Sequence, residues 1–274
     1  MKQKVSRIDY SKSMLPRTRR EEFLDCYKMN FALLVKCGLF LLVFAIPLIG
    51  FCLFMDFYYM SLLSQATEAV EQTKFIFFLV YNAGVIILCS LLLVALTGII
   101  HILRNFIWQE GIYFLSDFKD GVKQNIGKNM VFFSIFSVLY LLSYLVFSLF
   151  NIGLISYAPL MLFVLFLFPL FIWILFLNNT YSSNFSTLVR NATFFLIKGF
   201  GWSILGVAML LSSLLVIFMP FVLIWLKYII VALYFVFVYP AIILIMVLYT
   251  THKFDELINK VSYPDYYLKG LNHD

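Results

Sequence analysis

The chain has 274 residues, of which 63% are hydrophobic and only 12% are charged, with a mean hydropathy of +0.96. A soluble domain usually carries about 25% charged residues, so most of this surface cannot face water and a soluble globular fold is excluded. The net charge of +6 does not indicate a nucleic-acid partner, because the basic residues flank apolar runs instead of covering a polar domain. A lipid bilayer is therefore the expected surrounding.

The N-terminal segment 1–28 is polar and basic. It lacks the short apolar core and small-residue cleavage site of a cleaved signal peptide. We therefore expect a basic N-terminal arm over 1–28, followed by a first apolar run that is retained as a membrane anchor.

Uncharged apolar stretches of about 20 residues predict membrane-spanning helices. The long uncharged run from Met130 to Leu177 must cross twice, since at about 1.5 Å per residue it is near twice the thickness of a bilayer. The turn is placed at 151–159, where turn-forming residues gather, and Pro220 separates the last two spans. A transmembrane β-barrel is excluded because polar and apolar residues do not alternate. The six predicted spans lie near 31–55, 75–100, 130–150, 156–177, 194–219 and 221–249.

Lysine and arginine predict the orientation. Eight of them lie in the first 28 residues, and the second-to-third connection carries four more. The first-to-second connection has only Lys74, beside three acidic residues. Basic residues gather in cytoplasmic loops, so we expect both termini in the cytoplasm, a six-span membrane domain over 29–250 and a cytoplasmic tail over 251–274. The protein is expected to be a multi-pass protein of the cell membrane.

A short sequence pattern repeats along the chain. Residues 23–30 match residues 118–125 at four of eight positions, and 185–190 keeps the Phe and the basic residue at the same separation. Each copy precedes a pair of predicted spans, which suggests three helical hairpins, each introduced by a short amphipathic cytoplasmic helix. The alternative is chance similarity among segments next to the membrane. The predicted fold class is all-α, a polytopic transmembrane helical bundle.

The second copy is the clearest amphipathic segment, because five apolar residues between 114 and 126 share about a third of the helix circumference. We expect it to lie flat in the headgroup plane, or to dock its apolar face on a partner. The repeated segments supply the predicted contacts with a partner or anionic lipid: Lys28, Asn30, Phe118, Val122, Lys123, Asn125 and Arg190.

Lys36 and Lys198 are expected about two turns inside the first and fifth spans, at matching positions of two hairpins. Ionisable groups inside spans are functional candidates by default. One interpretation is that their long side chains return the ammonium to the interface. The other is that both line a shared polar cavity.

Catalytic and metal-binding motifs are absent from the sequence. The four cysteines form no CxxC pair, and the three histidines are isolated in sequence. We find neither an HExxH motif nor GxSxG nor paired intramembrane aspartates. The sequence therefore predicts no catalytic, cofactor-binding or metal-binding residue, no cofactor, and no enzyme.

The segment Arg104–Asn129 reads RNFIWQEGIYFLSDFKDGVKQNIGKN. It resembles the characteristic segment of the YesL-like family of uncharacterised bacterial integral membrane proteins. Residues 188–196 resemble that family's next juxtamembrane segment, and IPLIG at 46–50 echoes it loosely. The likeness covers about half the chain, and the longer N-terminal arm and tail depart from it. The corresponding motif residues are Arg104, Glu110, Phe114, Asp117, Phe118, Lys123 and Asn125.

The resemblance implies a companion of carbohydrate-uptake systems, with no catalytic or transport residues to carry over. The first hypothesis is therefore a non-enzymatic accessory or scaffold protein, partnered by a transporter or another membrane protein and associated with sugar uptake or a cell-envelope process. The alternative is a small-solute transporter or channel. It ranks second because few polar residues fall within the predicted spans.

Overall fold

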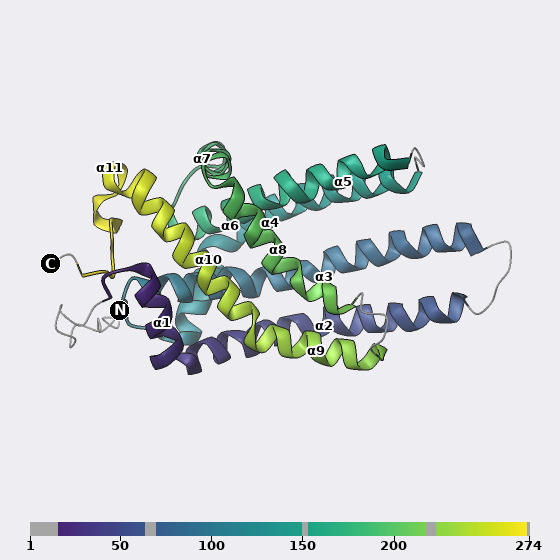
Figure 1. The fold of residues 1–274 in the computed structure, drawn as a ribbon, viewed down its shortest axis with the longest axis horizontal. Helices are drawn as coiled ribbons and strands as arrows, with labels where there is room; N and C mark the ends of the chain where they lie inside the picture. Colours follow the sequence, from purple (N-terminus) through teal and green to yellow (C-terminus); the bar gives the residue numbers. More distant parts are fainter. Residues whose placement is uncertain (1–15, 64–69, 150–152, 218–222, 273–274) are drawn as a thin grey trace.

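The computed structural model describes residues 16–63, 70–149, 153–217 and 223–272. Within these ranges every regular element is a helix, and the long helices pack side by side as a bundle (Figure 1). The predicted all-α helical fold class is confirmed. The N-terminal arm before residue 16, the turn residues Asn151 and Ile152, and Pro220 lie outside the described residues.

Four helices make up the first half of the chain. They are α1 (Arg19–Met29), α2 (Phe31–Leu63), α3 (Val70–Ile107) and α4 (Phe114–Leu149). The last three have 33, 38 and 36 residues, more than the roughly 20 residues that cross a bilayer. They contain the predicted span ranges that begin at 31 and 75 and almost all of the one that begins at 130.

The next helical segment, Gly153–Thr180, is assembled from short pieces. It consists of η2 (Gly153–Tyr157), α5 (Ala158–Leu162), a π-helical turn η3 (Phe163–Leu167) and α6 (Phe168–Thr180). The π turn ends two residues before Pro169, whose ring and missing N–H disturb the regular helical hydrogen bonds.

The chain then turns sharply. Helix α7 (Phe185–Lys198) meets α8 (Phe200–Ile217) at a bend of 97°, so α7 is seen nearly end-on in Figure 1 while α8 follows the bundle. Gly199 lies at this bend, where a Cβ atom would be only 3.0 Å from the hydroxyl of Tyr249. The corner is therefore tightly packed, and a side chain at this position would require the Tyr249 hydroxyl to shift.

The last helical segment returns along the bundle as α9 (Ile224–Phe237) and α10 (Tyr239–Phe254). Past residue 254 the helix continues without a break through a π turn, η4 (Asp255–Asn259), and ends in α11 (Lys260–Ser262). A 3-10 turn, η5 (Pro264–Tyr266), then leads the tail back to the bundle.

Helices α1 and α11 lie at the same end of the bundle (Figure 1). We call this the polar end, and the opposite end, where α5 begins, the far end. The described ranges contain five helical segments that are long and apolar enough to cross a membrane, plus the bent pair α7–α8. If the bent pair counts as one span, the chain crosses six times. An even number of crossings returns the chain to the end at which it started, in agreement with the shared end of α1 and α11.

The apolar faces of these helices are mostly not covered by the chain itself. Only 11% of the most apolar stretch of α4, and 22% of that of α2, is buried inside the protein. Leu, Ile, Val and Phe side chains make up much of the exposed surface of the spans. Water would strongly oppose so large an apolar surface, whereas hydrocarbon solvates it. The protein is a multi-pass integral membrane protein.

The expectation that the second amphipathic segment lies flat in the headgroup plane is wrong. Residues 114–126 form the first turns of α4 and continue into the span without a bend. The reason is close packing on α3: a Cβ at Gly98 would come within 2.4 Å of the Phe118 ring, and a Cβ at Gly121 within 2.4 Å of His101. Two glycines at this crossing let α4 lie directly against α3.

Helix α7, from the copy with the weakest sequence match, is instead the one that leaves the bundle direction. It buries Leu188, Ala192 and Phe195 against the protein. On the opposite side, two consecutive residues are exposed in every group of four. The exposed side chains are mostly apolar or uncharged and include two cations, Arg190 and Lys198. Such a face suits the membrane–water interface.

We predict that Gly38→Ala destabilises the packing of α2 on α9. The new Cβ would lie 1.9 Å from the backbone carbonyl oxygen of Val236, so the two helices must separate. Such overpacking typically costs about 1–3 kcal/mol. Unfolding of the purified protein in detergent, followed by circular dichroism, measures the loss.

The matched control is Gly50→Ala on the same helix, where a Cβ would meet nothing within 4 Å. Alanine favours a helix over glycine by up to about 1 kcal/mol, so this variant is expected to be as stable as the parent or more so. Equal behaviour of the two variants would contradict the close approach of α2 to α9 at Gly38.

Candidate functional site: the polar end of the bundle

A buried amide network joins three helices near the polar end. The Asn178 side chain on α6 donates to the Asn129 side-chain oxygen at 2.8 Å and to the backbone oxygen of Asn125 at 3.0 Å, both on α4. Asn129 in turn donates to the hydroxyl of Thr97 on α3 at 3.0 Å. All four residues are buried. The network fixes the register of α3, α4 and α6, because any sliding would leave buried polar groups without partners.

Arg104 links the end of α3 to the end of α6. Its guanidinium donates to the backbone carbonyl of Asn179 and, at 2.9 Å, to the side-chain oxygen of Asn105. The guanidinium carbon also lies 4.7 Å from the centre of the Trp108 ring. A cation at the C-terminal carbonyls of α6 is favourable, since those groups carry partial negative charge.

Asp117 holds the beginning of α4. Its carboxylate accepts a hydrogen bond of 2.7 Å from the backbone N–H of Tyr113, the residue before the helix. The side chain is fully buried. A carboxylate in the first turn satisfies a free N–H group and interacts favourably with the helix dipole, so this residue explains why α4 starts where it does.

The two ends of the chain are joined by a buried carboxylate. Asp255 accepts hydrogen bonds from Arg19 of α1 at 3.0 Å, from the side chain of Asn259 at 2.8 Å and from the backbone N–H of Leu268 at 3.2 Å. Arg19 also pairs with Glu22 at 2.9 Å. The side chains of all three charged residues are at most 9% exposed.

A second set of contacts holds the tail against the α3–α4 connection. Lys269 forms an ion pair of 2.7 Å with Glu110, and its ammonium lies 4.5 Å from the centre of the Trp108 ring. Trp108 stacks on Tyr266 with ring centres 5.0 Å apart. At Gly270, with φ of +89°, a Cβ would clash with the carbonyl oxygen of Ile107, so glycine permits this approach.

We call this assembly the cap. It comprises α1, the connections 108–113 and 181–184, and the tail 255–272. Removing one partner of a buried ion pair is strongly destabilising, although the intact pair contributes little net stability because both charges lose water. The ion pairs of the cap therefore specify one geometry of α1, the connection 108–113 and the tail, and the hydrogen bond of Tyr181 to Asn259 adds the connection 181–184.

The predicted contact residues do not share one surface. Phe118 and Asn125 are buried, Val122 and Asn30 are half-buried, and Lys123 and Arg190 are exposed. The structure gives the side chains of Phe118 and Asn125 contacts within the protein instead: Phe118 packs against Phe40 and Phe44 of α2, and the Asn125 amide donates to the backbone oxygen of Gly121. The side chain of Lys28 lies outside the described part of the structure.

Lys36 and Lys198 do not face one another. Both side chains are exposed, and α2 and α7 lie on opposite sides of the bundle in Figure 1. Lys198 also lies in the last turn of α7, where a cation interacts well with the free carbonyl groups. Their exposure favours the interpretation that these side chains reach the interface and disfavours a shared cavity.

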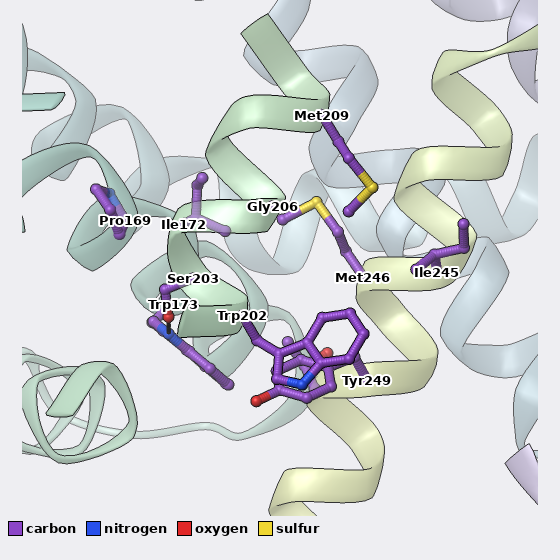
Figure 2. A pocket seen from close by; sticks show the side chains of 11 residues that line it. Pro169, Ile172, Trp173, Trp202, Ser203, Gly206, Met209, Ile245, Met246 and Tyr249 are labelled. Carbon is purple, nitrogen blue, oxygen red and sulfur yellow. Dashed lines mark hydrogen bonds between the residues drawn. The ribbon is translucent and has the colours of Figure 1, made fainter. Parts of the chain in front are cut away.

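The bundle contains a small apolar cavity between α6, α8 and α10. Figure 2 shows its aromatic wall, in which Trp202 stacks on Tyr249 with ring centres 5.0 Å apart and Trp173 donates to the Ser203 hydroxyl at 2.8 Å. Its volume of ≈ 30 Å³ suits one or two water molecules. This space is too small for a sugar or an amino acid.

Polar groups deeper in the spans bond to one another. Tyr140 donates to Asn82 at 2.6 Å and thereby joins α4 to α3. Tyr228 donates to the carboxylate of Asp56 at 2.6 Å and joins α9 to α2. These interhelical hydrogen bonds hold neighbouring helices together.

The contribution of the tail to this end is hard to see in the sequence. Asp255 and Asn259 are four residues apart, which is the spacing of neighbours on a helix, but their partners Arg19 and Tyr181 are remote in sequence. The pair Asn178–Asn179 is more conspicuous, because it follows directly on an uncharged apolar run. Because the partners of Asp255 and Asn259 are remote in sequence, the cap residues of the tail were not predicted from the sequence.

No group of three or more His, Cys, Asp or Glu residues gathers in the described ranges in a way that suits a metal ion. His101 packs against Gly121 inside the bundle, while His252 is exposed on α10. Comparisons of the chain with family models, curated proteins and solved structures give no match. The function is therefore argued from the geometry of the polar end.

We predict that Asn129→Leu lowers the free energy of unfolding by about 1–3 kcal/mol, because the Asn178 amide loses one of its two buried acceptors and the Thr97 hydroxyl loses the N–H from which it accepts. Denaturant unfolding in detergent micelles measures the loss. The control is Ser134→Ala on the same helix, since that exposed hydroxyl bonds to a carbonyl of its own helix. The control is expected within about 0.5 kcal/mol of the parent; an equally small effect of Asn129→Leu would show that the network contributes little.

Proposed function

We propose that this protein is a non-enzymatic accessory or scaffold component of a membrane assembly and that the cap is its docking surface. The observation that carries the proposal is the buried contact of Arg19 with Asp255, which ties the first described helix to the tail. Surfaces that are ordered before binding lose less conformational entropy when a partner docks. A tail held in one place suits such a role.

The surface of the cap also carries exposed apolar and aromatic side chains. Val261 in α11 is 85% exposed, and Tyr263 and Tyr267 of the tail are more than one-third exposed. Tyr113 and Leu115, at the start of α4, are exposed as well. Aromatic residues are enriched in protein interfaces, so this composition supports a protein partner.

The partner we propose is a transporter or another membrane protein. The segment 104–129, which resembles the YesL-like family, contributes Arg104, Glu110 and Asp117 to the polar end. The resemblance favours an association with carbohydrate uptake or a cell-envelope process.

We also propose that the polar end is cytoplasmic in the cell membrane. The lysine and arginine residues of α1, the second-to-third connection and the tail all belong to this end. Basic residues are retained on the cytoplasmic side. A partner of the cap is then a cytoplasmic subunit or a cytoplasmic region of a membrane protein.

The alternative, a small-solute transporter or channel, receives less support. A transport path needs polar groups that face a central space, but Asn82 and Asp56 are bonded to neighbouring helices. Lys36 belongs to α2 and Lys198 to α7, and these helices lie on opposite sides of the bundle in Figure 1. The scaffold proposal therefore stands first.

The scaffold proposal is tested by photo-crosslinking in native membranes. A photoreactive amino acid replaces Val261 in the cap or, as the matched control, Leu154 at the far end; these side chains are 85% and 87% exposed. Position 261 is expected to give one discrete protein adduct, identified by mass spectrometry as a membrane protein or its cytoplasmic subunit. Position 154 is expected to give lipid adducts only.

A second variant links the adduct to the geometry of the cap. Arg19→Met removes the charge that joins α1 to Asp255 and is expected to reduce crosslinking at position 261 by about tenfold or more, as loss of a buried pair allows. Expression and detergent monodispersity show whether this variant still folds. Lipid adducts alone at both positions, in otherwise native protein, would refute a docking role.

The orientation is tested with single cysteines in a background without the native ones. Thr73→Cys, in the polar first turn of α3 at the far end, is expected to react with a membrane-impermeant maleimide in intact cells, whereas Val261→Cys is expected to react only after permeabilisation, because the polar end carries the basic residues. The reverse pattern would place the cap outside the cell.

A further inference from the structure

The cap contains a second, larger recess, to which the scaffold role assigns no ligand. It lies between the α6–α7 connection and the tail and has a volume of ≈ 270 Å³. We call it the tyrosine recess. Its lining consists of Tyr181, Ser182, Ser262, Tyr263, Pro264, Asp265 and Tyr266.

Three of the lining residues are tyrosines, and their rings lie at similar distances from one another. The ring centre of Tyr181 lies 4.8 Å from that of Tyr263 and 6.2 Å from that of Tyr266, and the latter two are 6.0 Å apart. The Tyr181 ring is inclined by 34° to Tyr263 and by 63° to Tyr266. The three rings therefore contact one another at one side of the recess, and aromatic rings are the side chains that line the cages for ammonium groups.

The rings are held in place by the cap. The Tyr181 hydroxyl donates to Asn259 at 2.5 Å, and Asn259 is held by Asp255. Burial, and then the charge of Asp255, raises the pKa of Tyr181 well above its usual range, so the phenol stays a neutral donor. The Tyr266 ring is held in place by stacking on the Trp108 ring.

The charge of the lining favours a cation. Asp265 is exposed, and no basic side chain is among the residues that line the recess. The adjoining aromatic stack already holds one ammonium, since Nζ of Lys269 lies 4.5 Å from the Trp108 ring centre and 5.7 Å from that of Tyr266. That lysine is paired with Glu110, whereas Asp265 has no basic neighbour within the lining.

We infer that the tyrosine recess binds an alkylammonium group, with the tyrosine rings lining its site and Asp265 balancing its charge. The volume lies just below the roughly 300 Å³ at which pockets for larger ligands begin, so the occupant is a head group such as trimethylammonium. Its source is either a free quaternary-ammonium solute or a lipid head group. The recess lies within the cap, but the inference does not rest on the scaffold proposal, because choline binding is measured on the purified chain and requires no protein partner.

The test titrates choline into the purified full chain in maltoside micelles and follows binding by calorimetry. Its uncharged counterpart of the same shape, 3,3-dimethylbutanol, is titrated in parallel, with sodium chloride as the ionic-strength control. Saturable choline binding, about tenfold tighter than that of the alcohol, is expected because only the charged group gains from the rings and Asp265. Equal binding of both compounds, or none by choline, would overturn the inference.

Variants assign the binding to the recess. Tyr263→Ala and Asp265→Asn are each expected to weaken choline binding about tenfold, whereas Tyr267→Ala is expected to bind as the parent does. Tyr263 and Tyr267 are similarly exposed, at 39% and 37%, but only Tyr263 lines the recess. Because Asp265 is an exposed surface residue, its variant keeps the test decisive if Tyr263→Ala unfolds. Unchanged binding by Asp265→Asn, or equal losses in Tyr263→Ala and Tyr267→Ala, would refute the site.

A final pair of titrations distinguishes the two sources. The chain is reconstituted in nanodiscs of phosphatidylcholine or of phosphatidylglycerol, and free choline is titrated into each. If the lipid head group reaches the recess, free choline binds more weakly in phosphatidylcholine, because the lipid competes for the same site. Equal affinity in the two lipids assigns the recess to a free solute.

Discussion

Hydrocarbon offers no hydrogen bonds, so polar groups inside the membrane depend on partners within the protein. This constraint organises the bundle. Tyr140 bonds to Asn82, Tyr228 bonds to Asp56, and Asn178 reaches both α4 and, through Asn129, Thr97. Each contact joins two helices whose apolar faces alone would slide against one another, because lipid tails solvate these faces as well as a neighbouring helix does.

At the polar end of the bundle, buried charged groups also depend on partners within the protein, and ion pairs take the place of the amide hydrogen bonds. Arg19 and Asp255 gain little net stability from their contact because both lose water, but they tolerate only one arrangement. That arrangement fixes the tail, and the tail in turn positions Tyr263 and Tyr266 beside Tyr181. The proposed docking surface and the tyrosine recess therefore depend on one set of buried contacts.

The three repeated segments show how far similarity of pattern can predict structure. All three precede spans and all were expected to form short interfacial helices. Helix α1 is a separate helix, the second segment forms the beginning of α4, and α7 meets α8 at a bend of 97° beside Gly199. The difference comes from residues outside the repeat. Because Gly98 on α3 has no side chain, the Phe118 ring packs directly on α3, and the second segment lies against the bundle. No periodicity within a segment reports such a glycine on another helix.

Hydropathy and length alone determined that this chain is a helical membrane protein, because about 20 uncharged apolar residues in a row have no other stable surrounding. The run of spans and the excess of basic residues on one side follow from local composition. Tertiary structure decided which polar residues meet. Thr97, Asn129 and Asn178 come from three helices, and Arg19 and Asp255 come from opposite ends of the chain. Such pairings depend on helix rotation and crossing, which small residues such as Gly98 and Gly121 set through close packing, and a single sequence records neither.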